Sequence, residues 1–170
     1  MTDFSKTRSG FTYDVMSRLK KDGTLIDQLQ GVRNRIPMEG LNDLASAYFK
    51  GTAPPGQLYV GLWSGSLVPT GEETAANLLD AVTEVTSYSD PTRIPLVLGS
   101  VDRGTCSNLG QLARFDVSAN ATVNGAFLST VNAKGARYGK LLSVVRFPAP
   151  RIVDDSMYLE VLCGFQFISI

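Results

Sequence analysis

A strand-like alternation of side chains is clearest between residues 121 and 129. Its alternate positions carry small, β-branched or aromatic residues, and no helical stripe of apolar residues runs through it. A side-chain period of two is typical of a β-strand. A connection with two glycines, residues 132–139, leads to a second β-rich run, residues 141–147. We therefore expect two neighbouring strands joined by an exposed loop.

Further short runs of the same kind follow one another along the chain, separated by polar segments with glycine and proline. They are residues 57–63, 94–98, 112–117, 157–163 and 165–170. Strands at such spacing are typical of sandwiches and jelly rolls. The sequence therefore predicts a mainly β fold, a single β-sandwich or jelly-roll domain with short N-terminal helices.

The front of the chain shows a different spacing of apolar residues. After Thr24, the apolar residues Ile26, Leu29 and Val32 follow Leu25 at one, four and seven residues, and Thr24 with Asp27 has the spacing of a helix-capping box. Residues 13–19 show another short helical face. We therefore expect residues 1–36 to form an N-terminal arm with short amphipathic helices.

The clearest helical pattern begins at Gly40 and ends at Gly51. Apolar residues between Leu41 and Phe49 share one face, and Gly51 stands where a left-handed C-terminal cap belongs. The following segment, TAPPG, stops the helix because proline cannot continue it. The chain is thus divided into an arm (1–36), a helix with a Pro/Gly linker (37–56) and a β-sandwich body (57–170).

Residue types needed for most catalytic sites are scarce. The 170 residues include no histidine, which excludes Ser-His-Asp and Cys-His mechanisms. The two cysteines, Cys106 and Cys163, are too few for a zinc site, and we interpret them as buried free thiols. The pairs Glu72-Glu73 and Asp154-Asp155 lie in turn-like sequence, which favours solvated loops over facing glycosidase carboxyls. We expect no enzyme activity, no catalytic residue, no cofactor and no metal ion.

Charge is balanced over the whole chain but uneven along it. The chain has 16 basic and 16 acidic residues, and residues 1–36 carry seven of the basic against four of the acidic ones. We interpret this front segment as a surface that binds an acidic face of a partner protein; a solubilising helix face is the equally compatible alternative. The candidate contact residues are Arg18, Lys20, Lys21, Leu25, Ile26, Leu29, Val32, Arg33 and Arg35.

Nucleic acid and membranes are not expected as partners. Lys134, Arg137 and Lys140 share a loop with Tyr138, but at zero net charge a solvated hairpin tip is favoured over nucleic-acid binding. No window approaches the ~20 apolar residues of a membrane span, and the first ten residues lack the apolar core of a secretion signal. We expect the protein to be made in the cytoplasm.

Five blocks of sequence, each a short strand, helix or turn, follow one another between about Leu41 and Val161. They are LNDLASAYF, YVGLW, TEVTSYSDPTR, ARFDVSANATVNGAFLST (with KG shortly after) and FPAPRIVDDSMYLEV. In their order and spacing they resemble a family of small virion structural proteins, of the cement or decoration type, from tailed bacteriophages. The resemblance covers most of the body and not the front segment.

The resemblance implies a non-enzymatic virion component. The expected function is a capsid cement or decoration protein that binds and stabilises the shell of the major capsid protein of the same phage, as a homo-oligomer located in the virion. The alternative is a tail or connector component, including a receptor- or glycan-binding module in which Trp63, Tyr88 and Tyr138 stack on sugars. Packing in the core or an interface is the other interpretation of these aromatic residues.

Overall fold

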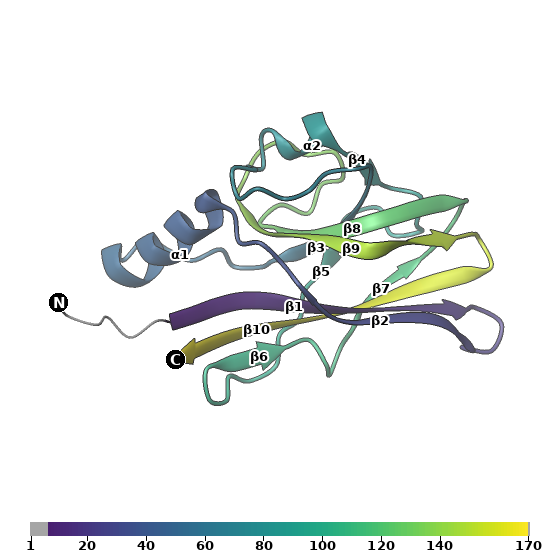
Figure 1. Cartoon of the computed structure of the whole chain (residues 1–170), viewed down its shortest axis with the longest axis horizontal. Coiled ribbons are helices and arrows are strands. Elements are labelled where there is room, and N and C mark those ends of the chain that lie inside the picture. Colours follow the sequence, from purple (N-terminus) through teal and green to yellow (C-terminus); the bar gives the residue numbers. More distant parts are fainter. Residues whose placement is uncertain (1–6, 170) are drawn as a thin grey trace.

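The computed structural model describes residues 7–169, whose strands form two antiparallel sheets (Figure 1). The first sheet has the order β2 (Leu25–Arg33), β1 (Thr7–Leu19), β10 (Met157–Ser169) and β6 (Thr105–Ser107), with β7 (Ala113–Asp116) also paired with β10. The second has the order β4 (Thr83–Val85), β3 (Tyr59–Ser64), β8 (Ala121–Ser129) and β9 (Leu141–Val153), with β5 (Ile94–Pro95) paired with β3. Strands make up 47% of the structure and helices 11%, so the predicted mainly β fold is confirmed.

The main hydrophobic core lies between the two sheets. On β1, Tyr13 and Val15 are fully buried, while the residues that alternate with them are exposed or half-buried. They stand opposite Cys163 and Val161 of β10, which are buried in the same core. The second sheet contributes to this core from its facing side, for example through Val60. Alternating burial of this kind is what a sheet with one covered face requires.

The short helices expected in residues 1–36 are wrong, because the described part of this segment forms strands β1 and β2. β1 pairs with β10 along its whole length, from Thr7 opposite Ser169 to Leu19 opposite Met157, and it lies between β2 and β10. From residue 7 onward the predicted arm is therefore part of the first sheet; residues 1–6 lie outside the described range. The physical reason is the two-residue period of the buried side chains on β1, which only a strand can place on one face.

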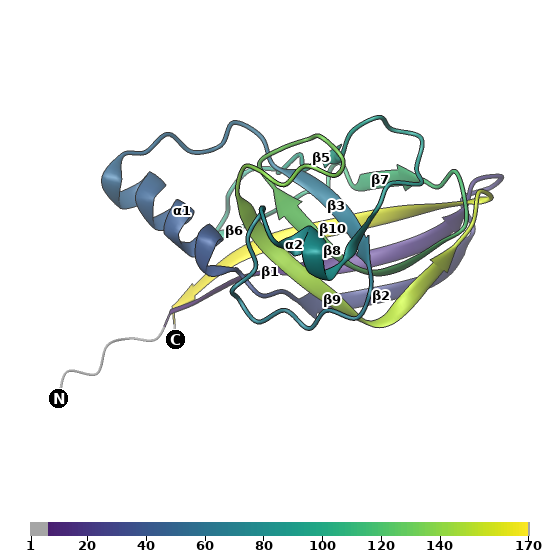
Figure 2. The ribbon, with the colours of Figure 1, turned by 90° about the horizontal axis from the view of Figure 1, so that it is seen from above.

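The predicted strand pair in residues 121–147 is confirmed, since β8 and β9 pair in the second sheet. The predicted helix near Gly40 is also confirmed as α1 (Met38–Lys50). Gly51 adopts the left-handed conformation, with φ of 68°, and its backbone N–H donates to Ser46 O, as expected of a helix cap. α1 projects from one end of the molecule, beyond both sheets (Figures 1 and 2).

The outer face of the second sheet carries a smaller core of its own. The short helix α2 (Leu78–Ala81) covers this face, and Leu78 packs with Trp63 of β3 and Phe127 of β8. Leu141 of β9 closes the same cluster. The second sheet is therefore covered on both faces in this region, whereas the first sheet has one covered face.

The chain passes from the first sheet to the second directly after β2. Arg35 forms an isolated bridge with Val144 of β9, in which each residue's N–H donates to the other's carbonyl, at 2.9 and 3.0 Å. Asp27 of β2 also forms an ion pair with Arg151 of β9. The edges β2 and β9 of the two sheets are thus joined along one side of the molecule.

Candidate functional site

The cationic residues among the predicted contacts differ in their exposure and in their bonds within the chain. The Arg18 guanidinium forms an ion pair with Glu160 at 3.0 Å, and Lys20 Nζ donates to Val117 O at 2.6 Å, so both are engaged within the chain. Lys21, in the turn between β1 and β2, is exposed, and so is Arg33. The exposed Arg35 packs alongside Gly71 as well as pairing its backbone with Val144.

The apolar residues among the predicted contacts divide in the same way. Leu29 and Val32 are half-buried and pack against the main core, so they are not available to a partner. Leu25 and Ile26 are 44% and 50% exposed. Besides Lys20 and Arg35, the predicted residues that stay exposed are Lys21, Leu25, Ile26 and Arg33, and we call these four the β2 surface. Lys21, Leu25 and Ile26 lie at the β1–β2 turn, and Arg33 lies at the other end of the strand.

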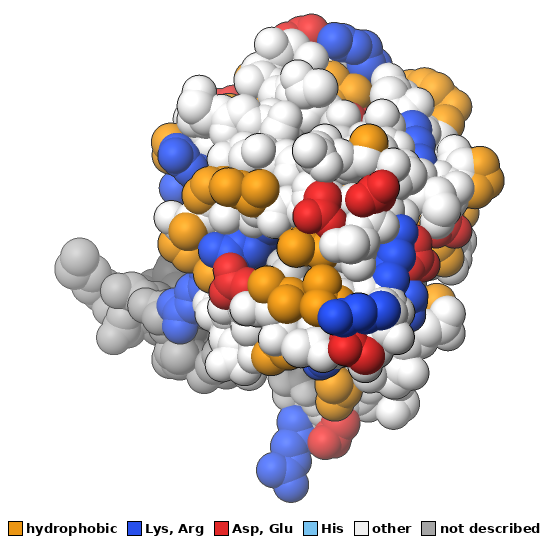
Figure 3. Space-filling model, turned by 90° about the vertical axis from the view of Figure 1, so that its right-hand side faces the viewer, with side chains coloured by type: hydrophobic (Ala, Val, Ile, Leu, Met, Phe, Trp, Pro, Cys, Tyr) orange, Lys and Arg blue, Asp and Glu red, His pale blue; other side chains and the backbone are white. Residues whose placement is uncertain are grey.

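The end of the molecule that carries the β1–β2 and β9–β10 turns shows charges of both signs among scattered apolar side chains (Figure 3). No continuous field of one sign covers this face. The β2 surface therefore offers a mixed contact, apolar at Leu25 and Ile26, and cationic at Lys21 in the turn and at Arg33 at the other end of the strand.

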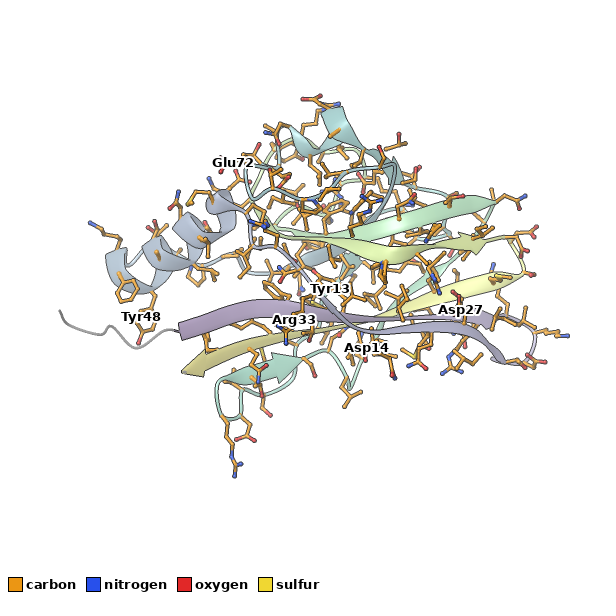
Figure 4. The ribbon with its side chains drawn as sticks, viewed as in Figure 1. Tyr13, Asp14, Asp27, Arg33, Tyr48 and Glu72 are labelled. Atoms are coloured by element: carbon orange, nitrogen blue, oxygen red, sulfur yellow. The ribbon has the colours of Figure 1, made fainter. Side chains whose placement is uncertain are left out.

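β2 lies at the edge of its sheet, but its backbone is irregular. The pairing register with β1 shifts at two places, which leaves extra residues on β2 near Ile26 and Gly31. Gly31 has φ of 63°, and its N–H donates to the Asp14 carboxylate at 2.7 Å. Asp27 lies on β2 below β9 and is paired with Arg151 (Figure 4). Bulges and charges of this kind hinder the addition of another strand, so β2 would bind a partner through side chains.

α1 is firmly attached to the body by its first turn. The Glu39 carboxylate accepts hydrogen bonds from the backbone N–H groups of Ala75 and Leu141, both at 2.8 Å. Gly40 lies against the backbone of β9, where an added Cβ would come within 2.9 Å of Leu141 O and Leu142 Cα. The direction in which α1 projects is therefore fixed by specific contacts at its base.

The far end of α1 carries two large aromatic side chains with little cover. Tyr48 is 84% and Phe49 78% exposed, and their rings pack edge to face with centroids 5.0 Å apart. Tyr48 lies at the end of the helix farthest from the sheets (Figure 4). We call this pair the aromatic knob.

A hollow opens beside the same helix, between α1, the Pro/Gly linker and the segment after β5. It encloses about 460 Å³, and most of its lining is apolar. Its apolar lining includes Leu44, Ala47, Pro55, Leu58, Leu96 and Leu142, and Asp43 also borders it. We call it the apolar hollow. A second depression of about 360 Å³ shares Asp43 and is bordered by Lys140.

The most deeply buried charges form a structural pair. Arg93 and Glu84 have side chains 2% and 3% exposed, and the guanidinium donates two hydrogen bonds of 2.8 Å to the carboxylate. The same guanidinium donates to Val131 O and Ala136 O, which fixes the loop between β8 and β9. The sequence contained no periodic signal for this pair, and its enclosure leaves no room for a substrate.

Tyr13, Ser143 and Asn34 form a second buried polar group. Tyr13 Oη donates to Ser143 Oγ at 2.7 Å, and Asn34 Nδ2 donates to the same oxygen at 2.7 Å. Burial, followed by the nearby Cys163, raises the pKa of Tyr13 well above its usual value. Burial also raises the pKa of the Cys163 thiol to about 12. Both groups therefore stay protonated at neutral pH and act as structural groups rather than as nucleophiles.

The aromatic residues considered for sugar binding are mostly unavailable. Trp63 and Tyr88 are 0% and 4% exposed, so packing is confirmed as their role, and only Tyr138 is open, at 65%. Cys163 is buried and Cys106 half-buried, and both thiols are free.

The two acidic pairs have different surroundings. Asp155 is exposed and Asp154 half-buried in the β9–β10 turn, but Glu73 is buried, so the prediction of a solvated pair is wrong at that residue. Burial raises the pKa of Glu73, and hydrogen bonds from the backbone N–H groups of Thr70 and Gly71 outweigh it and leave the pKa lowered. The Glu73 carboxylate therefore organises its own loop.

Within residues 7–169, no three side chains of His, Cys, Asp or Glu gather closely enough to hold a metal ion. Neither helix in the same range has the length and apolar character to span a lipid bilayer. Comparison of the chain with protein-family models gave no match, and comparison with curated proteins gave none either.

Proposed function

We propose that this protein is a structural component of the virion of a tailed bacteriophage, of the cement or decoration type, which binds and stabilises the shell of the major capsid protein. The observation that carries the proposal is the β2 surface, where Leu25 and Ile26 stand exposed near the β1–β2 turn that carries Lys21, on a strand paired with β1. The succession of sequence blocks that resembles small virion proteins supports the same assignment.

The proposal includes the finer description of the fold. We infer that the two sheets form a β-sandwich, since they share one core and lie as two layers (Figure 1). In such a sandwich the side chains of the two inner faces interdigitate to form a single core.

The β2 surface fits an acidic, partly apolar face on the capsid exterior. Burying Leu25 and Ile26 would contribute on the order of 1 kcal/mol each, since both are about half exposed in the free protein. Lys21 and Arg33 would add attraction that salt screens. Such contacts are weak singly, but they act together when repeated over a shell.

Binding to purified shells of the phage that encodes this chain tests the proposal. We expect the protein to co-sediment with shells, a Leu25→Ser/Ile26→Ser variant to bind at least tenfold more weakly, and added salt to weaken binding. The matched control is Val101→Ser/Leu109→Ser, which changes two residues that are 74% and 73% exposed and lie away from β2. Equal binding by both variants would remove the β2 surface from the proposal.

The place in the particle is tested by imaging virions labelled on this protein. Label over the whole capsid supports the cement assignment. Label at one vertex or on the tail would replace it with the alternative, a tail or connector component. A glycan-binding role at the tail depends on Tyr138 alone among the three aromatic residues, since Trp63 and Tyr88 are buried.

A further inference from the structure

α1 carries two features that fit each other when two copies of the chain meet. The aromatic knob lies near the C-terminal end of the helix, and the apolar hollow opens along the same helix beside Leu44 and Ala47. We propose that this protein forms a symmetric dimer in which the knob of each copy fills the hollow of the other. The partner of this surface is therefore a second copy of this chain.

The hollow matches the knob in size and chemistry. Its volume of about 460 Å³ lies in the range of protein pockets that accommodate ring-bearing groups, roughly 300–1,000 Å³. Leu58, Leu96 and Leu142 line it, so an aromatic side chain that enters it leaves water for an apolar surface. Aromatic residues that fill such pockets are commonly the strongest contacts of an interface.

The spacing along α1 allows both contacts to form at once. Leu44 of the hollow and Tyr48 of the knob are four residues apart, a rise of about 6 Å along the helix. A twofold axis that crosses α1 near Ser46, midway between Leu44 and Tyr48, would place two α1 helices antiparallel, so that the knob of each copy meets the hollow of the other. Such a contact is closed and yields a dimer rather than a filament.

The area available is sufficient for a stable dimer. The two aromatic side chains of each copy are about four-fifths exposed, and together the four would bury on the order of 600 Å². Small stable interfaces bury about 1,200 Å² in total. The part-exposed Leu41, Val97 and Leu98, which lie on α1 or beside the hollow, would supply most of the remainder.

The charges beside the two features are complementary. Asp43 borders the hollow, and Lys50 follows the knob; within the described chain neither forms an ion pair. Residues seven apart lie on the same face of a helix. In the antiparallel arrangement, Asp43 of each copy therefore faces Lys50 of the other, and two ion pairs flank the aromatic contacts.

This dimer surface is separate from the β2 surface, so its failure and the failure of the capsid proposal are distinguishable. α1 projects at one end of the molecule, whereas the β1–β2 turn lies at the opposite end (Figures 1 and 2). A dimer joined through α1 leaves both β2 surfaces open to the capsid.

Sedimentation velocity of the full chain over a range of concentrations tests the proposal. We expect a species of twice the chain mass of 18.3 kDa, and a Tyr48→Ser/Phe49→Ser variant whose dimer dissociation constant is raised roughly 100-fold or more. The Val101→Ser/Leu109→Ser variant is the control and should dimerise normally. Far-UV circular dichroism verifies that each variant remains folded.

Charge reversal tests the arrangement itself. Asp43→Lys and Lys50→Glu should each weaken the dimer, because each places like charges opposite one another, and the double variant should restore it. A wild-type chain that stays monomeric, a knob variant that dimerises normally, or a double variant no better than the single ones would overturn the proposal. If the wild-type chain is monomeric and the Tyr48→Ser/Phe49→Ser variant no longer binds shells, the aromatic knob contacts the capsid and not a second copy.

Discussion

The guanidinium of Arg93 joins segments that are distant in sequence. It is paired with Glu84 of β4 and donates to Ser129 Oγ at the end of β8 and to carbonyls of the loop that follows. The ring of Phe127 lies against the guanidinium, with the ring centroid 4.9 Å from Arg93 Cζ. A charge buried this completely is stable only while its partner is charged and in place.

Removing the charge of Glu84 should therefore be costly. We expect Glu84→Gln to lower the free energy of unfolding by about 3–5 kcal/mol, because it leaves the Arg93 charge buried without its counter-ion. Urea denaturation measures the loss. The control is Asp116→Asn in the exposed pair with Arg114, where the loss should be at most about 1 kcal/mol. Losses of equal size would contradict the structural role given to Arg93.

At the scale of elements, the position of β1 shows that the front of the chain is part of the first sheet and not a separate arm. β1 lies between two strands, and one face of it is buried in the main core while the other is open. An arm that docks on a finished body would tolerate changes at either face equally, whereas a strand inside a sheet would not.

Two substitutions on β1 distinguish these cases. We expect Val15→Asp to abolish cooperative folding, or to lower stability by more than about 3 kcal/mol, since it buries an unpaired carboxylate at a fully buried position. Thr12→Asp, at an exposed position of the same strand, should change stability by less than about 1 kcal/mol. Thermal unfolding followed by near-UV circular dichroism provides the comparison. If both substitutions changed stability by a similar small amount, residues 7–19 would behave as a docked arm and not as a strand inside the sheet.

The helical interpretation of the front failed for a reason that lies in β2. An extra residue near Gly31 places Leu29 and Val32, three positions apart, at successive inward sites opposite Val15 and Tyr13. A bulge thus turns a period of two into a spacing that resembles one helical turn. Thr24 and Asp27 have the spacing of a capping box, but a strand and not a helix follows Thr24. Asp27 forms an ion pair with Arg151.

Other elements were predictable because local signals sufficed. A few neighbouring residues were enough to predict the alternation in β8 and the strand-loop-strand order of β8 and β9. The same holds for the end of α1, which glycine and proline residues mark. The β2 surface was predicted only in part, because burial of Leu29 and Val32 depends on pairing with β1. The sequence places Tyr48 and Phe49 on the apolar face of the predicted helix. Only the direction in which Glu39 and Gly40 hold α1 reveals that these two side chains are exposed.

At the scale of the whole molecule, the buried thiol makes stability depend on pH in the alkaline range. The folded chain holds the Cys163 proton up to a pKa of about 12, whereas the ordinary pKa of a cysteine thiol is 9.0. Because the unfolded chain loses this proton first, the free energy of unfolding should fall as pH rises from about 9 to 12. Tyr13, whose pKa is raised from 10.0, adds to the fall above about pH 10.

The contribution of Cys163 is isolated by comparing slopes. Between about pH 9 and 10, Cys163→Ala should make the fall of stability with pH shallower, by at most about 1.4 kcal/mol per pH unit, the value for one proton. Val161→Ala removes apolar volume from the same strand without removing a titrating group, so it should lower stability and keep the wild-type slope. Urea denaturation at several pH values measures both. An unchanged slope in Cys163→Ala would show that its proton is not retained on folding.

The pairing of β1 with β10 joins residues near one end of the chain to residues near the other. During synthesis on the ribosome, β1 emerges early and has no neighbour except β2 until residues 157–169 are free of the exit tunnel. Contacts this distant in sequence slow folding, and the unfinished first sheet exposes the apolar side of β1 in the meantime. All strands of the second sheet lie between Tyr59 and Val153, so they are available to pair before β10 is, and the first sheet is the last part of the fold that can be completed.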